Sequence, residues 1–218
     1  MKTLLQLTAV LLVAGFYSCK KSEVKLTPLA SLNLTNAVIA APTVYLNGNT
    51  DSVTNNNFGE FTLLAGKSAV KVVAGAQSYY NQTLSTANGS YYSLFLAGAS
   101  PAAVDAILIK ESYQNYTDSL CGVRFINLSP DSQPVSVDIQ GNANGSAVSS
   151  LAYKAYTGFL PYPAKLADAA YNFEVRDAAS GNVIATYTLN TPYFHNVTLA
   201  LTGSVNAGTA AILQVNEF

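Results

Sequence analysis

The stretch "GVRFINLSPDSQPVSVDIQGN", residues 122–142, decides the fold class of this chain. It holds two runs rich in Val, Ile and Phe, a loop with two prolines between them, and a Gly-Asn turn at its end. Short β-branched and aromatic runs bounded by Pro, Gly and Asn are typical of β-strands. Residues 31–49, "SLNLTNAVIAAPTVYLNGN", have the same order, so we expect the same β unit twice.

Two further pairs of similar blocks extend the repeat. "YYSLFLAG" (residues 91–98) is echoed by "FHNVTLALTG" (194–203), and "AILIKE" (106–111) is echoed by "AILQVNE" (211–217). The four blocks follow one order in both halves, and each half holds about seven candidate strands, as an immunoglobulin-like domain does.

The sequence therefore predicts an all-β fold with two tandem immunoglobulin-like β-sandwich domains, residues 30–117 and 118–218. The alternative is one large sandwich or barrel whose halves are similar by chance.

The composition narrows the classes of partner. The 218 residues are 50% hydrophobic and only 11% charged, and 11 Lys and Arg face 12 Asp and Glu, for a formal net charge of −1. A chain with this balance has no global field that would attract nucleic acid or anionic lipid. Nucleic acid is therefore not an expected partner.

The first residues have the pattern of a secretory signal. Met1 and Lys2 begin a short positive region, and residues 4–14 are apolar but too few to span a bilayer as a helix. "FYSC" then resembles the lipobox of bacterial lipoproteins, in which a small residue precedes the cysteine that is acylated. By this resemblance residues 1–18 are a lipoprotein signal peptide and Cys19 is the lipidated first residue of the mature chain. The alternative is an ordinary cleaved signal with an incidental cysteine.

The anchor and the residues after it predict a location. Two or more acyl chains hold a protein stably on a membrane, so the chain would be anchored to the bilayer through its lipid. Residues 19–29 are polar and end near Pro28, which predicts a flexible tether. Lys20 stands where inner-membrane lipoproteins commonly carry Asp, which favours the outer membrane of a Gram-negative bacterium. Whether the body faces the periplasm or the outside stays open.

"VRFINLSPDSQPVSVDIQGN" also resembles the opening of an uncharacterised family of bacterial lipoproteins. That family is built on a repeated immunoglobulin-like β-sandwich domain of unknown function, with an Asn-x-Ser-Pro-Asp loop between its first two strands. The resemblance covers both halves, although the first half lacks Ser-Pro-Asp. It implies a fold and an envelope location but no activity.

The Asn-x-Ser-Pro-Asp loop has a physical interpretation of its own. Asn127 can bond the turn that it opens, Pro130 restricts φ, and Asp131 can accept backbone N–H groups. A structural role in the turn is the favoured interpretation. A ligand role for Asp131 and Asp138 is the alternative.

The residues needed for catalysis are sparse. His195 is the one histidine, and no Gly-x-Ser-x-Gly motif occurs in the sequence. No spacing singles out a carboxylate pair or a set of metal ligands, so no catalytic residue, metal or cofactor is expected. Cys121 is expected to be a buried small apolar residue. The prediction is a non-catalytic envelope module for binding, adhesion or assembly; the alternative is a glycan-processing hydrolase or a carbohydrate-binding accessory protein.

Tyrosines offer the best candidates for a binding surface. The chain has 14 Tyr and no Trp. Tyr91, Tyr156 and Tyr162 lie in tyrosine-bearing segments that could hold a glycan or an envelope protein, although half of such residues can belong to the core.

The position of Tyr91 follows from an expected hairpin in "NQTLSTANGSYYSLFL". A left-handed Gly89 in its loop would place Leu84, Tyr92, Leu94 and Leu96 on one face, with Tyr91 and Phe95 on the other.

Two tripeptides suggest a modification. "DSV" with Ser52 and "DSL" with Ser119 resemble the Asp-Ser-aliphatic acceptor of a bacterial O-glycosylation system, and both are expected in loops.

Overall fold

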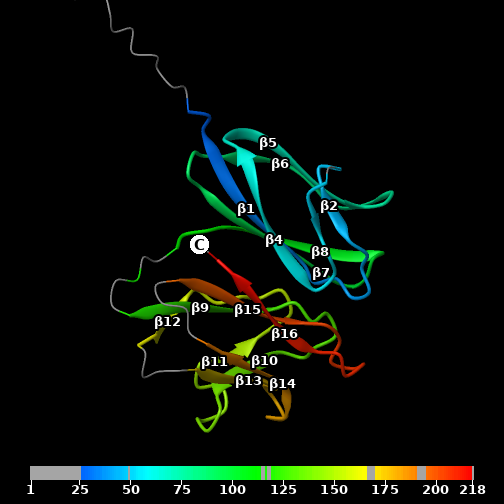
Figure 1. The fold of residues 1–218 in the computed structure, drawn as a ribbon. Coiled ribbons are helices and arrows are strands. Elements are labelled where there is room, and N and C mark those ends of the chain that lie inside the picture. Colours follow the sequence, from blue (N-terminus) through cyan, green and yellow to red (C-terminus); the bar gives the residue numbers. More distant parts are fainter. Residues whose placement is uncertain are drawn as a thin grey trace, which may run out of the picture.

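The structure is a computed structural model that describes residues 26–48, 50–113, 116, 119–165, 170–190 and 195–217. Within these residues the chain is all-β and forms two β-sandwiches, one after the other (Figure 1). The strands of the first sandwich are β1 (Leu29–Asn36), β2 (Val44–Leu46), β3 (Ser52–Val53), β4 (Asn57–Leu64), β5 (Gly66–Ala74), β6 (Gln77–Thr86), β7 (Tyr91–Ser100) and β8 (Ala103–Lys110). The strands of the second are β9 (Leu120–Asn127), β10 (Val135–Ile139), β11 (Val148–Leu151), β12 (Leu160–Pro163), β13 (Tyr171–Asp177), β14 (Val183–Leu189), β15 (Asn196–Thr202) and β16 (Ala211–Asn216).

The two sandwiches match strand for strand. The first has the sheets β4-β1-β7-β8 and β3-β2-β5-β6, and the second has β12-β9-β15-β16 and β11-β10-β13-β14. In each, the first strand pairs in parallel with the seventh, β1 with β7 and β9 with β15. The predicted all-β tandem of sandwiches is confirmed, and the repeated blocks of the sequence fall on equivalent strands.

The immunoglobulin-like topology is not confirmed. An immunoglobulin constant domain has seven strands, with the first and second in the same sheet. Here the described part of each sandwich has eight strands, and the first and second strands lie in different sheets, β1 opposite β2 and β9 opposite β10.

The expected hairpin around Gly89 is wrong in one respect. Gly89 has a left-handed φ of 72°, and Leu84, Tyr92, Leu94 and Leu96 do share one core. However, β6 and β7 lie in different sheets, because both edges of β7 are already paired, with β1 and with β8. The connection crosses from one sheet to the other and closes the end of the sandwich.

Each sandwich has an apolar core between its own two sheets. In the second, Phe125 of β9 meets Phe173 of β13 edge to face, with ring centroids 5.2 Å apart. Cys121 lies in the same core and is fully buried, as expected, and burial raises the pKa of its thiol to about 11. A thiol in this environment is a poor nucleophile.

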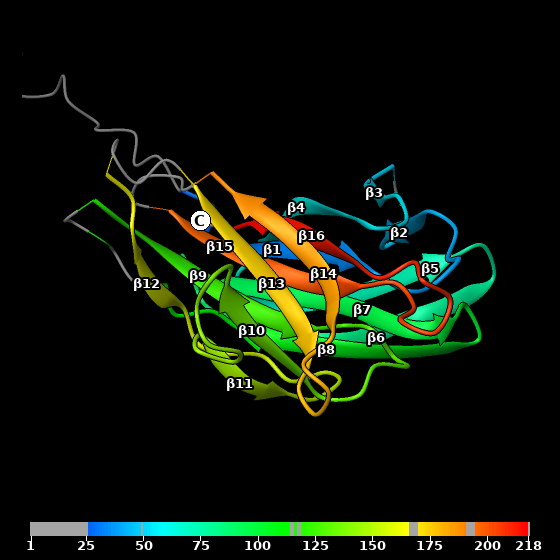
Figure 2. The same ribbon diagram turned by 90° about the horizontal axis from the view of Figure 1, so that it is seen from below.

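The sandwiches stack on one another through one sheet each. Sheet β4-β1-β7-β8 faces sheet β12-β9-β15-β16, so that four sheets are layered along the molecule (Figure 1), and Figure 2 shows the second sandwich in front of the first. A third apolar cluster fills this seam, with Phe95 and Ile109 from the first sandwich and Ile126 and Val215 from the second. Burial on both faces explains the apolar runs at residues 94–97 of β7 and 199–201 of β15.

Candidate functional site

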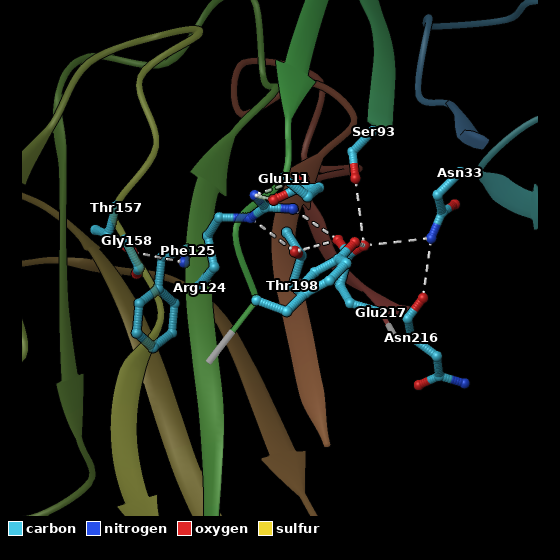
Figure 3. A network of polar contacts seen from close by, with 11 residues as sticks. Asn33, Ser93, Glu111, Arg124, Phe125, Thr157, Gly158, Thr198, Asn216 and Glu217 are labelled. Atoms are coloured by element: carbon cyan, nitrogen blue, oxygen red, sulfur yellow. Dashed lines mark hydrogen bonds and ion pairs between the residues drawn. The ribbon is translucent and has the colours of Figure 1, made fainter. Parts of the chain in front are cut away.

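A buried ion-pair cluster joins the two sandwiches at one end of the seam (Figure 3). Arg124 of β9 places Nη1 2.8 Å and 2.9 Å from the two carboxylate oxygens of Glu111, which follows β8 of the first sandwich. Its Nη2 lies 2.7 Å from Oε1 of Glu217, which follows β16. The three side chains are at most 2% exposed. We call Glu111, Arg124 and Glu217 the seam cluster.

Hydroxyl groups complete the bonds of the seam cluster. Thr198 Oγ1 accepts from Arg124 Nε at 2.9 Å and donates to Glu217 Oε1 at 2.6 Å. The hydroxyl of Tyr113 donates to Glu217 Oε2 at 2.9 Å. The ring of Phe159 lies 4.6 Å from the guanidinium carbon of Arg124 and covers it. Each nitrogen and oxygen of the three charged groups has at least one hydrogen-bond partner, which offsets part of the cost of burying the charges.

The seam cluster carries one cation and two carboxylates. Burial raises the pKa of Glu217 above its ordinary value, and Arg124 opposes this effect only in part. Burial and the nearby charge of Glu217 also raise the pKa of Tyr113, which therefore stays protonated and can donate. Burial is the main cause of the raised pKa of Glu217, and the charge of Glu111 adds to it.

The raised pKa of Glu217 predicts a pH dependence of the free energy of unfolding. The folded chain holds the proton of the Glu217 carboxyl more tightly than the unfolded chain does. The stabilisation that results is fully present below the ordinary glutamate pKa of about 4.3, and it is lost as the pH rises through the pKa of Glu217 in the folded chain. Glu217→Gln should remove this dependence, because an amide does not titrate, and its Oε1 can still accept from Arg124 and Thr198.

Denaturant titration at several pH values checks this expectation. The free energy of unfolding of the wild type, minus that of Glu217→Gln, should decrease as the pH rises. Glu60→Gln, at an exposed position of β4, serves as the control for charge alone. If the free energy of unfolding of the wild type minus that of Glu217→Gln increased with pH, the predicted direction of the pH dependence would be wrong.

The seam is built from equivalent positions of the two repeats. The pairing of β1 with β7 and of β9 with β15 makes Asn33 the counterpart of Arg124, and the blocks ending β8 and β16 make Glu111 the counterpart of Glu217. Arg124 bonds Glu111 of the other sandwich, and Asn33 Nδ2 lies 3.5 Å from Glu217 Oε2 of the other sandwich. This reciprocity is the mark of a two-fold interface.

The reciprocal contact is unequal. Arg124 makes a bidentate ion pair, whereas Asn33 Nδ2 donates to the Asn216 carbonyl at 2.9 Å and reaches Glu217 only at 3.5 Å. The Oδ1 of Asn33 is buried without a hydrogen-bond partner within the described part of the chain. Arg124 therefore supplies the stronger of the two reciprocal polar contacts across the seam.

A cleft of about 400 Å³ opens beside the seam cluster. It is lined by residues 109–112 at the end of β8, by Arg124 and by residues 156–159. The latter segment is held along β9, where Thr157 N donates to the Phe125 carbonyl at 2.9 Å and Thr157 Oγ1 accepts from Phe125 N at 3.0 Å. We call this the seam cleft.

Tyr156 is the exposed aromatic residue of the seam cleft. It is 47% exposed, and Lys110 and Ser112 are exposed on the opposite wall. A ring face beside hydroxyl and ammonium donors can hold a ligand that has both apolar and polar faces. The charges next to it are already bonded to each other, so the site offers contact surface and hydrogen bonds.

The other two candidate tyrosines are half-buried. Tyr162 packs edge to face against Tyr171 and Phe173, at 5.3 Å from each, and burial raises its pKa to about 12. Tyr91 is half-buried, with its ring 5.4 Å from that of Tyr113. Part of each ring is covered by neighbouring rings, which alternation along a strand could not show, and a binding surface at Tyr91 and Tyr162 stays a prediction.

Asp131 and Asp138 have structural partners. Asp131 accepts from Ser204 Oγ and from the N–H groups of Val205 and Asn206, so it ties its loop to the β15–β16 turn. Burial raises its pKa, but these bonds outweigh the effect and keep the pKa below the usual value. Asp138 is fully buried and lies 3.3 Å from Arg176.

The remaining candidates are dispersed. Ser52 is exposed in β3, which is an edge strand rather than the expected loop, and Ser119 is half-buried before β9 with a positive φ of 50°. His195 is exposed next to a small pocket with Asn196 and Glu217. Cys19 lies outside the described residues. Across the described ranges, no group of three or more His, Cys, Asp or Glu could hold a metal ion, and no helix is long and apolar enough to cross a membrane.

The seam cluster was not expected from the sequence. Two signals could have indicated it: the repeated block "AIL" ends on Glu in both halves, and a single Arg interrupts the apolar run "VRFIN". When both faces of a strand are buried, an Arg on the face that points away from the sandwich core requires a carboxylate partner.

Comparison with known proteins agrees with the strand-for-strand repeat. A family model described as a domain of unknown function, DUF4397, matches residues 30–138 and again residues 121–217. The chain belongs to this family. No protein with a curated description matches the chain.

Two solved structures show a distant likeness. One is the C-terminal domain of AlgF from P. aeruginosa, at 13% identity and a TM-score of 0.32, covering 38% of this chain and 97% of that one. The other is the family 26 carbohydrate-binding module of Amy13K from Eubacterium rectale, solved with maltoheptaose. It has 7% identity and a TM-score of 0.27, and the match covers 87% of this chain and 96% of that one. Neither likeness is close enough to indicate a shared function.

Proposed function

We propose that this chain is a non-catalytic lipoprotein of the bacterial outer membrane that binds a glycan or an envelope protein in the seam cleft. The observation that supports this most is Tyr156, an exposed ring in a cleft that both sandwiches line. Because the two walls come from different sandwiches, the cleft exists only in the tandem arrangement. This gives the repeat a role that one sandwich alone would lack.

The chemistry of the cleft favours binding over catalysis. General acid–base catalysis needs a titratable group that can exchange its proton with a substrate. Arg124 and Glu111 lie beside the cleft, but they are 2% exposed and bonded to each other. Lys110, Ser112 and Tyr156 are accessible and can donate hydrogen bonds without a reaction.

The proposed location rests on the sequence alone. The apolar segment of residues 4–14, Ser18 and Cys19 are in the order of a lipoprotein signal, and Lys20 favours the outer membrane. An acyl anchor would keep the two sandwiches near envelope glycans and proteins at high local concentration.

Tyr156→Ala tests the proposed site. We expect it to weaken binding to the envelope ligand about tenfold. Loss of a stacked aromatic ring costs about 0.5–1.5 kcal/mol of binding free energy in addition to the loss of buried apolar area. Arrays of bacterial envelope polysaccharides and capture from envelope extracts would identify the ligand. The affinity of wild type and variant would then be measured by titration calorimetry, with thermal melts to confirm folding.

Tyr45→Ala is the matched control for this experiment. Tyr45 is 40% exposed but lies on β2, in the outer sheet of the first sandwich. It should leave the affinity unchanged. Equal losses in both variants, or none in Tyr156→Ala, would remove the seam cleft as the binding site.

The alternative function, a glycan-processing hydrolase, has its own test. His195 is the one histidine and is exposed, so His195→Ala should have no effect on a binding module. Hydrolysis of an envelope glycan that disappeared in this variant would favour the enzyme.

A further inference from the structure

Three exposed leucines gather where the chain enters the first sandwich. Leu26 is 84% exposed, Leu29 is 42% exposed and Leu64 is 62% exposed. Leu29 at the start of β1 pairs directly with Leu64 at the end of β4, so the two side chains lie side by side on one face of the sheet. Ala65 N donates to the Pro28 carbonyl at 2.9 Å, which holds the segment with Leu26 against the same end. We call these three residues the leucine edge.

The segments that adjoin the leucine edge carry no acidic side chain. They are residues 26–29, 64–67 and 86–90, joined by bonds from Leu29 N to Asn88 Oδ1 and from Gly89 N to the Leu29 carbonyl. These segments contain one charged residue, the exposed Lys67, and no Asp or Glu. Glu111, at the same end of the sheet, lies two strands away after β8 and is paired with Arg124. A contiguous apolar patch rimmed by polar and basic groups indicates an interaction surface.

The sequence before Leu26 says what can reach this surface. Only residues 20–25 separate Leu26 from Cys19, and a fully extended chain of seven steps spans about 25 Å at most. Three of these six residues are Lys and one is Glu, so this short segment has a net charge of 3 − 1 = +2, although the whole chain has −1. A lipid on Cys19 would therefore keep Leu26 within about 25 Å of the bilayer surface, and the local basic charge favours anionic headgroups.

We infer that the leucine edge docks on the surface of the bilayer that holds the acyl anchor. This inference rests on the proposed lipidation of Cys19. Leucine side chains beside lysines are the groups that interfacial segments place at the boundary of headgroups and acyl chains. Docking would fix the orientation of the sandwiches relative to the membrane, because β1 would enter the body at the bilayer surface.

The absence of Trp from the chain allows a direct test. Leu64→Trp places a single fluorescent reporter in the leucine edge. Val183→Trp is the matched control, since Val183 is 46% exposed at the start of β14, in the outer sheet of the second sandwich. Both variants would be produced as full lipidated chains and reconstituted in vesicles of phosphatidylethanolamine and phosphatidylglycerol, with and without brominated acyl chains.

Docking predicts a blue shift and a loss of fluorescence with brominated lipid for Leu64→Trp, and neither change for Val183→Trp. If both reporters stay unquenched while the protein floats with the vesicles, the anchor is present and the docking is wrong. If the chain carries no lipid label and does not float, both the anchor and the docking are overturned. Leu29→Trp repeats the test if thermal melts show that Leu64→Trp is unfolded.

Discussion

Arg124→Met is expected to lower the free energy of unfolding by about 3–5 kcal/mol, the usual cost of removing one partner from a buried ion pair. Methionine fills a similar volume, so the loss comes mainly from Glu111 and Glu217, which would remain buried without their cation. The deficit should be largest at neutral pH and should shrink on acidification, because protonation removes the unpaired charges. Denaturant titration of wild type and variant at several pH values measures this difference in the free energy of unfolding.

Two controls separate this effect from general damage. Lys154→Met breaks an ion pair with Asp105 that is 46% and 42% exposed at the rim of the seam, and it should cost only about 0–1 kcal/mol. The triple variant Arg124→Met, Glu111→Gln and Glu217→Gln removes all the charges and should be more stable than Arg124→Met alone. A single Arg124→Met variant as stable as the Lys154 control would contradict the role assigned to the seam cluster.

Cys19→Ala is expected to abolish acylation completely, because Cys19 supplies the one thiol in the register of the signal. Cells grown with labelled palmitate should label the wild type and leave Cys19→Ala unlabelled. Fractionation should then find the variant outside the outer membrane.

The second cysteine gives the control for labelling. Cys121 is fully buried in the core of the second sandwich, so Cys121→Ala should be labelled like the wild type. Label that persists in Cys19→Ala, or that is lost in Cys121→Ala, would reject the lipoprotein signal.

The repeat could be predicted because its blocks lie on equivalent strands. "SLNLTN" and "GVRFIN" lie in the first strands of the two sandwiches, and "AILIKE" and "AILQVNE" contain most of their last strands. In a sandwich, every second residue of a strand faces the core. Equivalent strands of the two repeats therefore retain similar runs of apolar residues. The buried position of Cys121 followed from the same pattern.

The partition of strands between sheets could not be predicted from local pattern. Alternation along β6 and β7 shows which residues face the core, but both sheets of a sandwich face the same core. The hairpin expected at Gly89 therefore satisfied every local rule and still placed β7 in the wrong sheet. Pairing across long sequence distances decides that choice.

The candidate site was only partly predictable for a related reason. Tyr156, Tyr91 and Tyr162 look alike in the sequence, and packing between distant elements separates them. Tyr162 is covered by Tyr171, and Tyr91 by Tyr113, whereas Tyr156 lies on an irregular segment along β9 and stays open. The seam that brings Glu111 to Arg124 depends on how two sheets stack.

Recovery of the bound ligand tests the central proposal, binding without turnover in the seam cleft, most directly. The wild-type chain would be incubated with the polysaccharide or envelope protein that it captures, and the ligand would be eluted and analysed by mass spectrometry. The proposal predicts that the ligand is retained by wild type and Tyr45→Ala, is largely lost from Tyr156→Ala, and is recovered at its original mass. Cleavage products that form with wild type and disappear with His195→Ala would contradict it.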